Sequence, residues 1–181
     1  MDTLTAIARR YSFRGKYDPA PVPRDDLLKI VQAGYAAPSG CNVQTTSFLV
    51  LDAPEIMQQA GALLSAHPGF AGAPAGVLVL TQRLPGNGGR FYNVQDYAAA
   101  IENMLLAATD LGYVSCWVEG QITGGSDIGR RLANALGVPA GYEPVCYLPM
   151  GRPAPGERTG CTAKKKPLHE RVFFNRFGQA E

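Results

Sequence analysis

The chain has 181 residues, of which 46% are hydrophobic, so it is long enough to bury a core as one domain spanning residues 1–181. It contains no run of about 18 or more apolar residues, and its N-terminus lacks the apolar centre of a secretory signal. With a net charge of only +2 and no nucleic-acid-binding motif, it gives little support to DNA or RNA binding.

The positions of the cysteines and of the charged residues limit the kinds of site that the chain can form. Four cysteines are widely scattered and form no CxxC pair, which indicates neither a zinc nor an iron–sulfur site and favours a reduced, cytoplasmic protein. Between Val31 and Gly129 the only cations are Arg83 and Arg90, and most other cations lie at the two ends of the chain. These basic ends could meet at one phosphate, or they could be solvated termini.

The first half of the chain alternates helical and strand-like patterns. A short helix is expected first, with Asp2 or Thr3 as its cap, and a proline-rich extended segment follows it. Two short apolar runs, Ser47–Leu51 and Gly76–Thr81, are typical of buried strands. The helices expected in this half cover Thr3–Arg10, Arg24–Tyr35 and Pro54–Leu64.

A long helix dominates the second half. Asn93 with Asp96 predicts a capping box at its start, and Gly112 predicts its C-terminal cap. The helix is apolar around most of its circumference, so it either runs through the core or packs against a second subunit. The other elements expected here are strands over Tyr113–Val118 and Tyr142–Leu148 and a helix over Ser126–Leu136.

The segment Ala36–Gln44 links a helix to a strand and is longer than such links usually are. It combines polar side chains with small residues that allow close approach of a ligand to the backbone, and Pro38 stiffens it. A rigid polar loop suits the edge of a flat heterocycle. The alternative is that the Pro-Ser-Gly sequence merely ends a helix.

The C-terminal segment is basic and then apolar. Residues 153–166 are rich in proline, glycine and lysine, whereas Pro167–Phe177 carries several large apolar side chains. Apolar groups at this density predict a docking surface, either on this chain or on a partner.

No cofactor-free catalytic arrangement is evident. His67 and His169 are the only histidines, and neither has a metal-binding or Cys/His spacing. GxSxG and HExxH motifs are absent as well. If the chain is an enzyme, these absences favour a bound cofactor that carries the difficult step.

Two motifs give the chain a family resemblance. Arg10-Tyr11-Ser12-Phe13-Arg14, followed after a helix by Ala37-Pro38-Ser39-Gly40-Cys41-Asn42-Val43-Gln44, resembles the opening of the nitroreductase family of FMN-dependent oxidoreductases. Weaker similarity continues through Trp117–Gly120 and Lys164–Leu168. The resemblance implies an α+β, three-layer fold with a central mixed β-sheet flanked by helices. It also implies an intertwined homodimer with FMN at the subunit interface.

The resemblance also implies roles for individual residues. Arg10, Lys164 and Lys166 match phosphate-binding positions, and Ser12 and Arg14 lie towards the ribityl chain and the pyrimidine ring. The peptide around Glu119 and Gly120 matches the segment facing flavin N5, which makes these two the candidate catalytic residues, although Glu119 could be an ordinary strand-end carboxylate. The full expected FMN set is Arg10, Tyr11, Ser12, Arg14, Pro38, Ser39, Gly40, Asn42, Gln44, Val118, Glu119, Gly120, Lys164 and Lys166, with no metal.

The implied activity is a two-step, ping-pong transfer from NADH or NADPH, through FMN, to a nitroaromatic, a quinone or a similar flat acceptor. Two alternatives remain: an FMN-binding protein for storage or sensing, and a specialised dehydrogenase or dehalogenase of one metabolite. The sequence departs from the family at Tyr11, at Thr45-Thr46 and in the short segment 82–92, so acceptor preference stays open.

Overall fold

The computed structural model describes residues 1–64, 72–161 and 163–178. Its helices and strands confirm the α+β class. His67, one of the two histidines considered above, lies outside the described residues. The α-helices are α1 (Thr3–Arg9), α2 (Arg24–Tyr35), α3 (Pro54–Leu64), α4 (Asn93–Asp110), α5 (Gly120–Thr123) and α6 (Ile128–Ala135). The strands are β1 (Thr46–Leu51), β2 (Ala75–Thr81) and β3 (Glu143–Met150), and short 3-10 turns cover Gly40–Asn42, Asn87–Gly89 and Leu168–Glu170.

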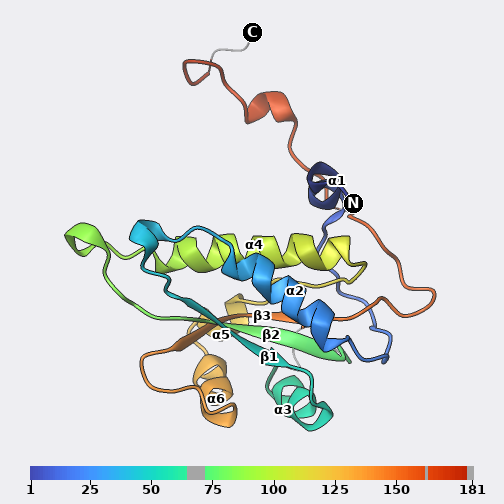
Figure 1. Ribbon diagram of the computed structural model, residues 1–181. Coiled ribbons are helices and arrows are strands. Elements are labelled where there is room, and N and C mark those ends of the chain that lie inside the picture. The colour runs from blue at the N-terminus through green and yellow to red at the C-terminus, as the bar shows by residue number, and fades with distance from the viewer. Residues whose placement is uncertain (65–71, 162, 179–181) are drawn as a thin grey trace.

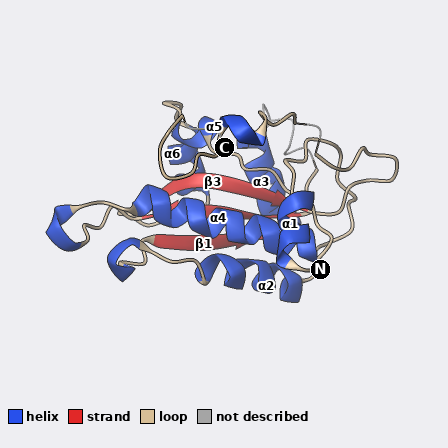
Figure 2. Cartoon of the chain, turned by 90° about the horizontal axis from the view of Figure 1, so that it is seen from above, coloured by secondary structure: helices blue, strands red, loops and turns tan. Residues whose placement is uncertain are grey.

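The three strands form an antiparallel sheet in the order β1-β2-β3 (Figure 2). Every residue of the central strand β2 is buried, as its uninterrupted apolar sequence predicts. Val79 pairs with Phe48 on one side and with Cys146 on the other. The register of β2 on β3 shifts after Val79, where Leu80 pairs with Pro144 and Val145 has no partner on β2, as in a β-bulge.

Helices cover both faces of the sheet, which confirms the three-layer prediction (Figure 1). Successive side chains of β2 point to opposite faces, so Val77 and Val79 join the core under α2 and α4. Leu78 and Leu80 join the second core, which α3 and α6 close. Helix α4 packs against α2, α1 and the sheet of its own chain, and this accounts for much of its apolar circumference.

The segment Tyr113–Val118 does not form the continuous strand that was predicted. Val118 pairs with Tyr147 and Val114 pairs with Gly151, but only as isolated antiparallel bridges. In this register Pro149 lies midway between these pairs and faces Cys116, and it has no N–H to donate. The segment instead forms one parallel bridge, through Ser115, with Ser12. Mixed pairing is therefore confined to this edge of the sheet.

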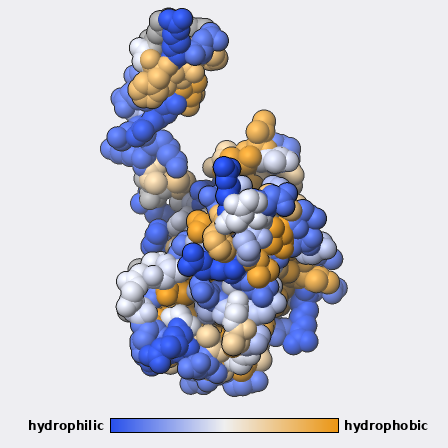
Figure 3. All heavy atoms as spheres, turned by 90° about the vertical axis from the view of Figure 1, so that its left-hand side faces the viewer, coloured by the Kyte–Doolittle hydropathy of each residue, from blue (hydrophilic) through white to orange (hydrophobic). Residues whose placement is uncertain are grey.

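The chain beyond Gly151 leaves the sheet, and its last described part projects away from the body (Figure 1). Apolar atoms gather on this projection (Figure 3). Leu168, Phe174 and Phe177 are 75%, 58% and 89% exposed, so they find no docking surface within the described part of their own chain. Among the described residues, no helix has the length and apolar character needed to cross a membrane.

Candidate functional site

The loop between α2 and β1 has an unusual backbone. Cys41, Asn42 and Gln44 have φ angles of 53°, 54° and 56°, in the left-handed region that non-glycine residues rarely adopt. Only one other non-glycine residue in the described part of the chain, Asn175, has a positive φ. Each such residue costs on the order of 1 kcal/mol or more, and such conformations cluster at functional sites. Other contacts must therefore hold this loop in place.

Asp96 on α4 supplies that support. Its Oδ1 accepts a hydrogen bond from the Gly40 amide at 2.8 Å, and its Oδ2 accepts one from Thr45 Oγ1 at 2.7 Å. Asp96 is 4% exposed and Thr45 only 1%, so the pair is shielded from water. A single carboxylate thereby fixes both ends of the Gly40–Thr45 segment. The Gln44 amide adds a bond to Ser39 Oγ within the loop.

The predicted capping box with Asn93 was wrong. Helix α4 has Tyr92 as its N-cap, and no side chain caps it. The carboxylate of Asp96 is engaged by the loop instead, which is why the helix start has no side-chain cap from it. The sequence pattern thus singled out Asp96 correctly as a hydrogen-bonding residue, but it predicted a helix cap where Asp96 instead binds the loop. The Tyr92 ring also explains Gly40, because a Cβ atom there would lie 2.3 Å from this ring.

The loop borders a cavity of about 410 Å³. Of the predicted cofactor-binding residues, it brings together Pro38, Ser39, Asn42 and Gln44, and Asp96 also lines the wall. Thr46 also lines this wall, although its Oγ1 is inaccessible and has no hydrogen-bond partner in the described chain.

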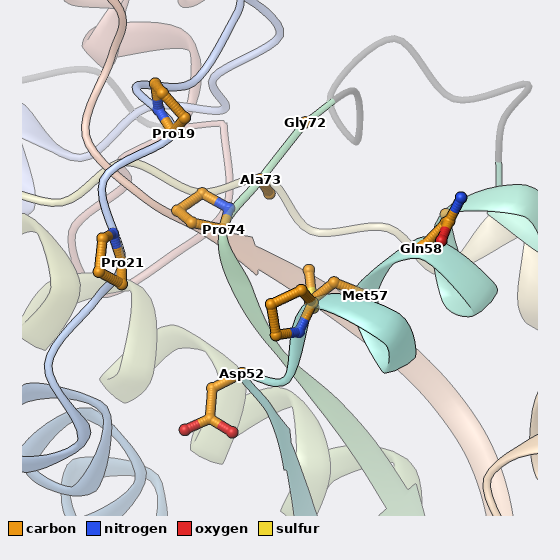
Figure 4. Close-up of a pocket in the computed structure, with 10 residues that line it drawn as sticks. Pro19, Pro21, Asp52, Met57, Gln58, Gly72, Ala73 and Pro74 are labelled. Atoms are coloured by element: carbon orange, nitrogen blue, oxygen red, sulfur yellow. The ribbon is translucent and has the colours of Figure 1, made fainter.

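A larger cavity, of about 670 Å³, lies beyond the opposite end of β1 (Figure 4). It has a mainly apolar wall that includes four prolines and Met57, and Asp52 on its rim pairs with Arg24. None of the predicted site residues lines it. Volume alone therefore does not identify the functional site in this molecule.

The N-terminal motif is held beside the edge of the sheet. Phe13 is buried, and its amide donates to the Ser115 carbonyl at 2.8 Å. The flanking Ser12 and Arg14 remain exposed, as alternation along an extended segment requires. Arg10 forms an ion pair with Glu102 of α4, with an Nε–Oε1 distance of 3.1 Å. Tyr11 has a buried hydroxyl with no partner among the described residues.

The thiol of Cys116 lies close to this motif. Burial raises the pKa of Cys116, while the positive charge of Arg14 and a hydrogen bond with Ser12 act in the opposite direction. Ser12 and Arg14 are thus near each other and near the end of the segment that leads to Val118. The structure therefore brings the N-terminal motif towards the segment that carries Glu119.

The segment Val118–Gly120 ends in the first residue of α5. Val118 is buried, and its backbone exchanges hydrogen bonds with Tyr147. Glu119 accepts hydrogen bonds from Tyr97 and Trp117. Burial of Tyr97, together with its hydrogen bond to Glu119, raises the pKa of Tyr97 to about 12. Gly120 is exposed and borders open space.

Lys164 and Lys166 are exposed on the tail. In the described chain, no hydrogen bond or ion pair joins either lysine to Arg10 or to another residue. The structure of one chain therefore gathers four loop residues around a cavity and places Arg10–Arg14 beside residues 115–116. It does not bring the two lysines into a polar contact with either group.

Comparison with known proteins decides the family. A model of the nitroreductase family matches residues 7–68 and 57–152. The chain belongs to the nitroreductase family. The match includes the N-terminal motif, the loop and Glu119, whereas Lys164 and Lys166 lie beyond it.

Individual members of the nitroreductase family support this membership. A protein of Methanothermobacter thermautotrophicus, provisionally named NADH dehydrogenase/NAD(P)H nitroreductase, is 31% identical over 172 residues, which cover 87% of this chain and 82% of the relative. The solved structure of a nitroreductase with bound FMN from Bacteroides fragilis is 28% identical, with a TM-score of 0.72 and 100% of both chains covered. A structure from Bacteroides thetaiotaomicron, with the same provisional name as the first relative, is 25% identical and has a TM-score of 0.80, covering 97% of this chain and 98% of the other.

Proposed function

We propose that this protein is an FMN-dependent oxidoreductase that passes electrons from NADH or NADPH to nitroaromatics, quinones or similar flat acceptors by a ping-pong mechanism. The observation that carries the proposal is the loop of left-handed residues that Asp96 holds around a polar cavity. Its support is the relative with bound FMN, whose whole length this chain matches. Residues 1–181 would form one FMN-binding domain.

The residues present fit FMN. The guanidinium of Arg10 suits a phosphate dianion, to which Lys164 and Lys166 would add charge, and Ser12 offers a hydroxyl beside it. Gly120 has no positive φ, and a Cβ atom there would meet no protein atom within 4 Å. Neither conformation nor packing in one chain therefore explains a glycine, whereas a ring lying against it would. When bound, FMN would supply the acceptor of a hydride and the donor of electrons.

The protein's own groups would then orient the reactants. Arg14, exposed beside Ser12, would place a positive charge near the pyrimidine end of the ring. This charge would favour the reduced, anionic form of the flavin. Pro38, Ser39, Gly40 and Asn42 would offer the ring a stiff polar edge. No histidine is needed, because protons can come from water. Glu119 and Gly120 would present the peptide that faces the reacting side of the ring.

Two copies would complete the site. The apolar side chains of the tail, Leu168, Phe174 and Phe177, are exposed in a single chain. We therefore propose that the tail docks on a partner subunit in a homodimer. The loop of one protomer would then contact the FMN held by the other protomer's Arg10 and lysines. All four cysteines are unpaired, which suits the reducing cytoplasm.

The direct test is purification followed by flavin spectroscopy and turnover. The protein is expected to bind FMN, to turn yellow, and to oxidise NADH or NADPH at a rate that rises on addition of menadione or a nitroarene. Bound FMN without acceptor-dependent NAD(P)H oxidation would favour storage or sensing instead. A preparation that stays colourless after incubation with FMN would refute the proposal.

The assignment of the phosphate to Arg10 has its own test. Arg10→Ala is expected to raise the Kd for FMN by roughly 10- to 150-fold, the equivalent of a charge-assisted hydrogen bond of about 1.5–3 kcal/mol. Riboflavin lacks the phosphate, so its Kd should stay within about threefold of the wild-type value.

The ion pair of Arg10 provides the matched control. Glu102→Gln removes the carboxylate that engages Arg10, at a cost in stability typical of an exposed pair, about 0–1 kcal/mol. FMN affinity should be unchanged or higher in this variant. Equal FMN affinity in Arg10→Ala and wild type would remove Arg10 from the phosphate site.

A further inference from the structure

The carboxylate of Glu119 links its own segment to helix α4. Its Oε1 accepts a hydrogen bond from Tyr97 Oη of α4 at 3.0 Å. Its Oε2 accepts a second bond from Trp117 Nε1 at 2.7 Å. The two donors come from different segments, so the carboxylate is held from two directions. Hydrogen bonds to both oxygens of a carboxylate fix its position and orientation.

Both donors are fixed by packing. Tyr97 is buried in the core that α2, α4 and the sheet share, and Trp117 packs against the same core. Each side chain has one N–H or O–H donor, so neither can turn to another acceptor and still hold Glu119. The position of the carboxylate is therefore set by the rigid part of the molecule.

The backbone of Glu119 is held as well. Its carbonyl accepts hydrogen bonds from the amides of Ile122 at 2.7 Å and Thr123 at 3.0 Å, at the start of α5. Gly120 is the first residue of this short helix, and first-turn amides have no acceptor within their own helix. With both its side chain and its carbonyl fixed, Glu119 fixes the orientation of the peptide N–H of Gly120.

That peptide borders the open space described above. The face of Gly120 where a side chain would stand is free of protein atoms within 4 Å. Among the described residues, the Gly120 amide donates no backbone hydrogen bond. A rigid, unengaged amide is suited to donate a hydrogen bond to a flat ring without reorganising. By contrast, the Glu119 oxygens are both engaged on the core side, by Tyr97 and Trp117.

We propose that Glu119 is a positioning residue, held by Tyr97 and Trp117, which aims the Gly120 amide at the reacting side of the bound ring and moves no proton itself. This inference rests on the proposed function, because the ring is that of FMN. It assigns a role to Tyr97 and Trp117, which carry no catalytic group of their own. The three side chains act as one unit, so weakening any of them should have the same consequence.

The test compares Tyr97→Phe, Trp117→Phe and Glu119→Gln in the FMN-loaded protein. The measurements are the visible absorption spectrum and midpoint potential of bound flavin, the single-turnover rate of NADH oxidation over a range of pH, and the Kd for FMN. Each variant should shift the flavin spectrum and potential in the same direction and slow NADH oxidation by about two- to twelvefold, the worth of one hydrogen bond. The Kd for FMN should change by less than about threefold, because its phosphate contacts are untouched.

Tyr113→Phe is the matched control. Tyr113 is buried and its hydroxyl also donates to a carboxylate, Asp26 Oδ2, at 2.8 Å, but neither belongs to the proposed site. This variant should lose thermal stability to a similar degree as Tyr97→Phe and leave the flavin spectrum and potential unchanged. The double variant Tyr97→Phe/Glu119→Gln should show the spectral shift of Glu119→Gln alone, as expected for one unit.

Three results would overturn the proposal. If Glu119→Gln removes one limb of the pH–rate profile that both donor variants retain, Glu119 transfers a proton. If the donor variants lose stability but keep the wild-type spectrum and potential, Tyr97 and Trp117 are only structural. If wild-type protein binds no FMN, the proposed function fails first and this inference fails with it.

Discussion

Asp96→Ala is expected to abolish tight FMN binding and to destabilise the protein by about 3–6 kcal/mol. The substitution removes two hydrogen bonds to a buried charged group, each worth about 1.5–3 kcal/mol, and leaves the Gly40 amide and the Thr45 hydroxyl unpaired. Without that support, the left-handed residues of the loop should relax to ordinary conformations, and the stiff edge offered to the ring should be lost. Chemical denaturation and FMN titration measure the two effects.

Two further variants make this test specific. Asp96→Asn keeps the shape and can still accept one of the two bonds, so it should fall between wild type and Asp96→Ala in both measurements. Asp26→Ala removes another carboxylate that accepts two side-chain bonds, from Lys29 and Tyr113, away from the loop. It should lower stability while preserving FMN affinity. Wild-type FMN affinity in Asp96→Ala would show that the loop does not contact the cofactor.

If the protein forms the proposed dimer, Phe174→Ser combined with Phe177→Ser is expected to convert it into monomers at micromolar concentration. Burying one phenylalanine on a partner is worth about 1.5–3 kcal/mol, so the pair contributes about 3–6 kcal/mol. The dimer dissociation constant should rise by about 10²- to 10⁴-fold. Sedimentation velocity over a dilution series would measure the change.

The control for the tail is Val50→Ser, which replaces an exposed apolar side chain on β1. It should leave the dissociation constant within about threefold of the wild-type value. A wild-type protein that is already monomeric, or a double variant that remains fully dimeric, would contradict docking of the tail on a partner.

Much of the fold could be predicted because local patterns agree with the tertiary structure. The apolar run of β2 is buried on both faces, and the helix Pro54–Leu64 was predicted with the observed bounds. The strand over Tyr113–Val118 was not predictable in the same way, because its pairing depends on Pro149 of a strand some thirty residues later. Strand propensity is a property of one segment, whereas a ladder of backbone hydrogen bonds needs N–H donors on both paired strands.

The candidate site, whose role stays a prediction, could be located to a similar extent. The family motif located the loop, and the structure adds the left-handed angles and the cavity. The supports of the site were not visible in the sequence: Asp96 lies 56 residues from Gly40, and Tyr97 lies 22 residues from Glu119. Only folding brings these pairs together. Adjacent polar and aromatic residues at the start of a long helix, as at Asp96-Tyr97, are the one signal that could have suggested them.

The projecting tail has a consequence for handling the protein. If each flavin is enclosed by two protomers, assembly and flavin retention are linked by mass action, so each strengthens the other. A concentrated stock would keep its colour, whereas the same stock diluted to nanomolar assay levels would bleach slowly as subunits separate. Specific activity would then fall with dilution and with time, and added free FMN would slow both losses.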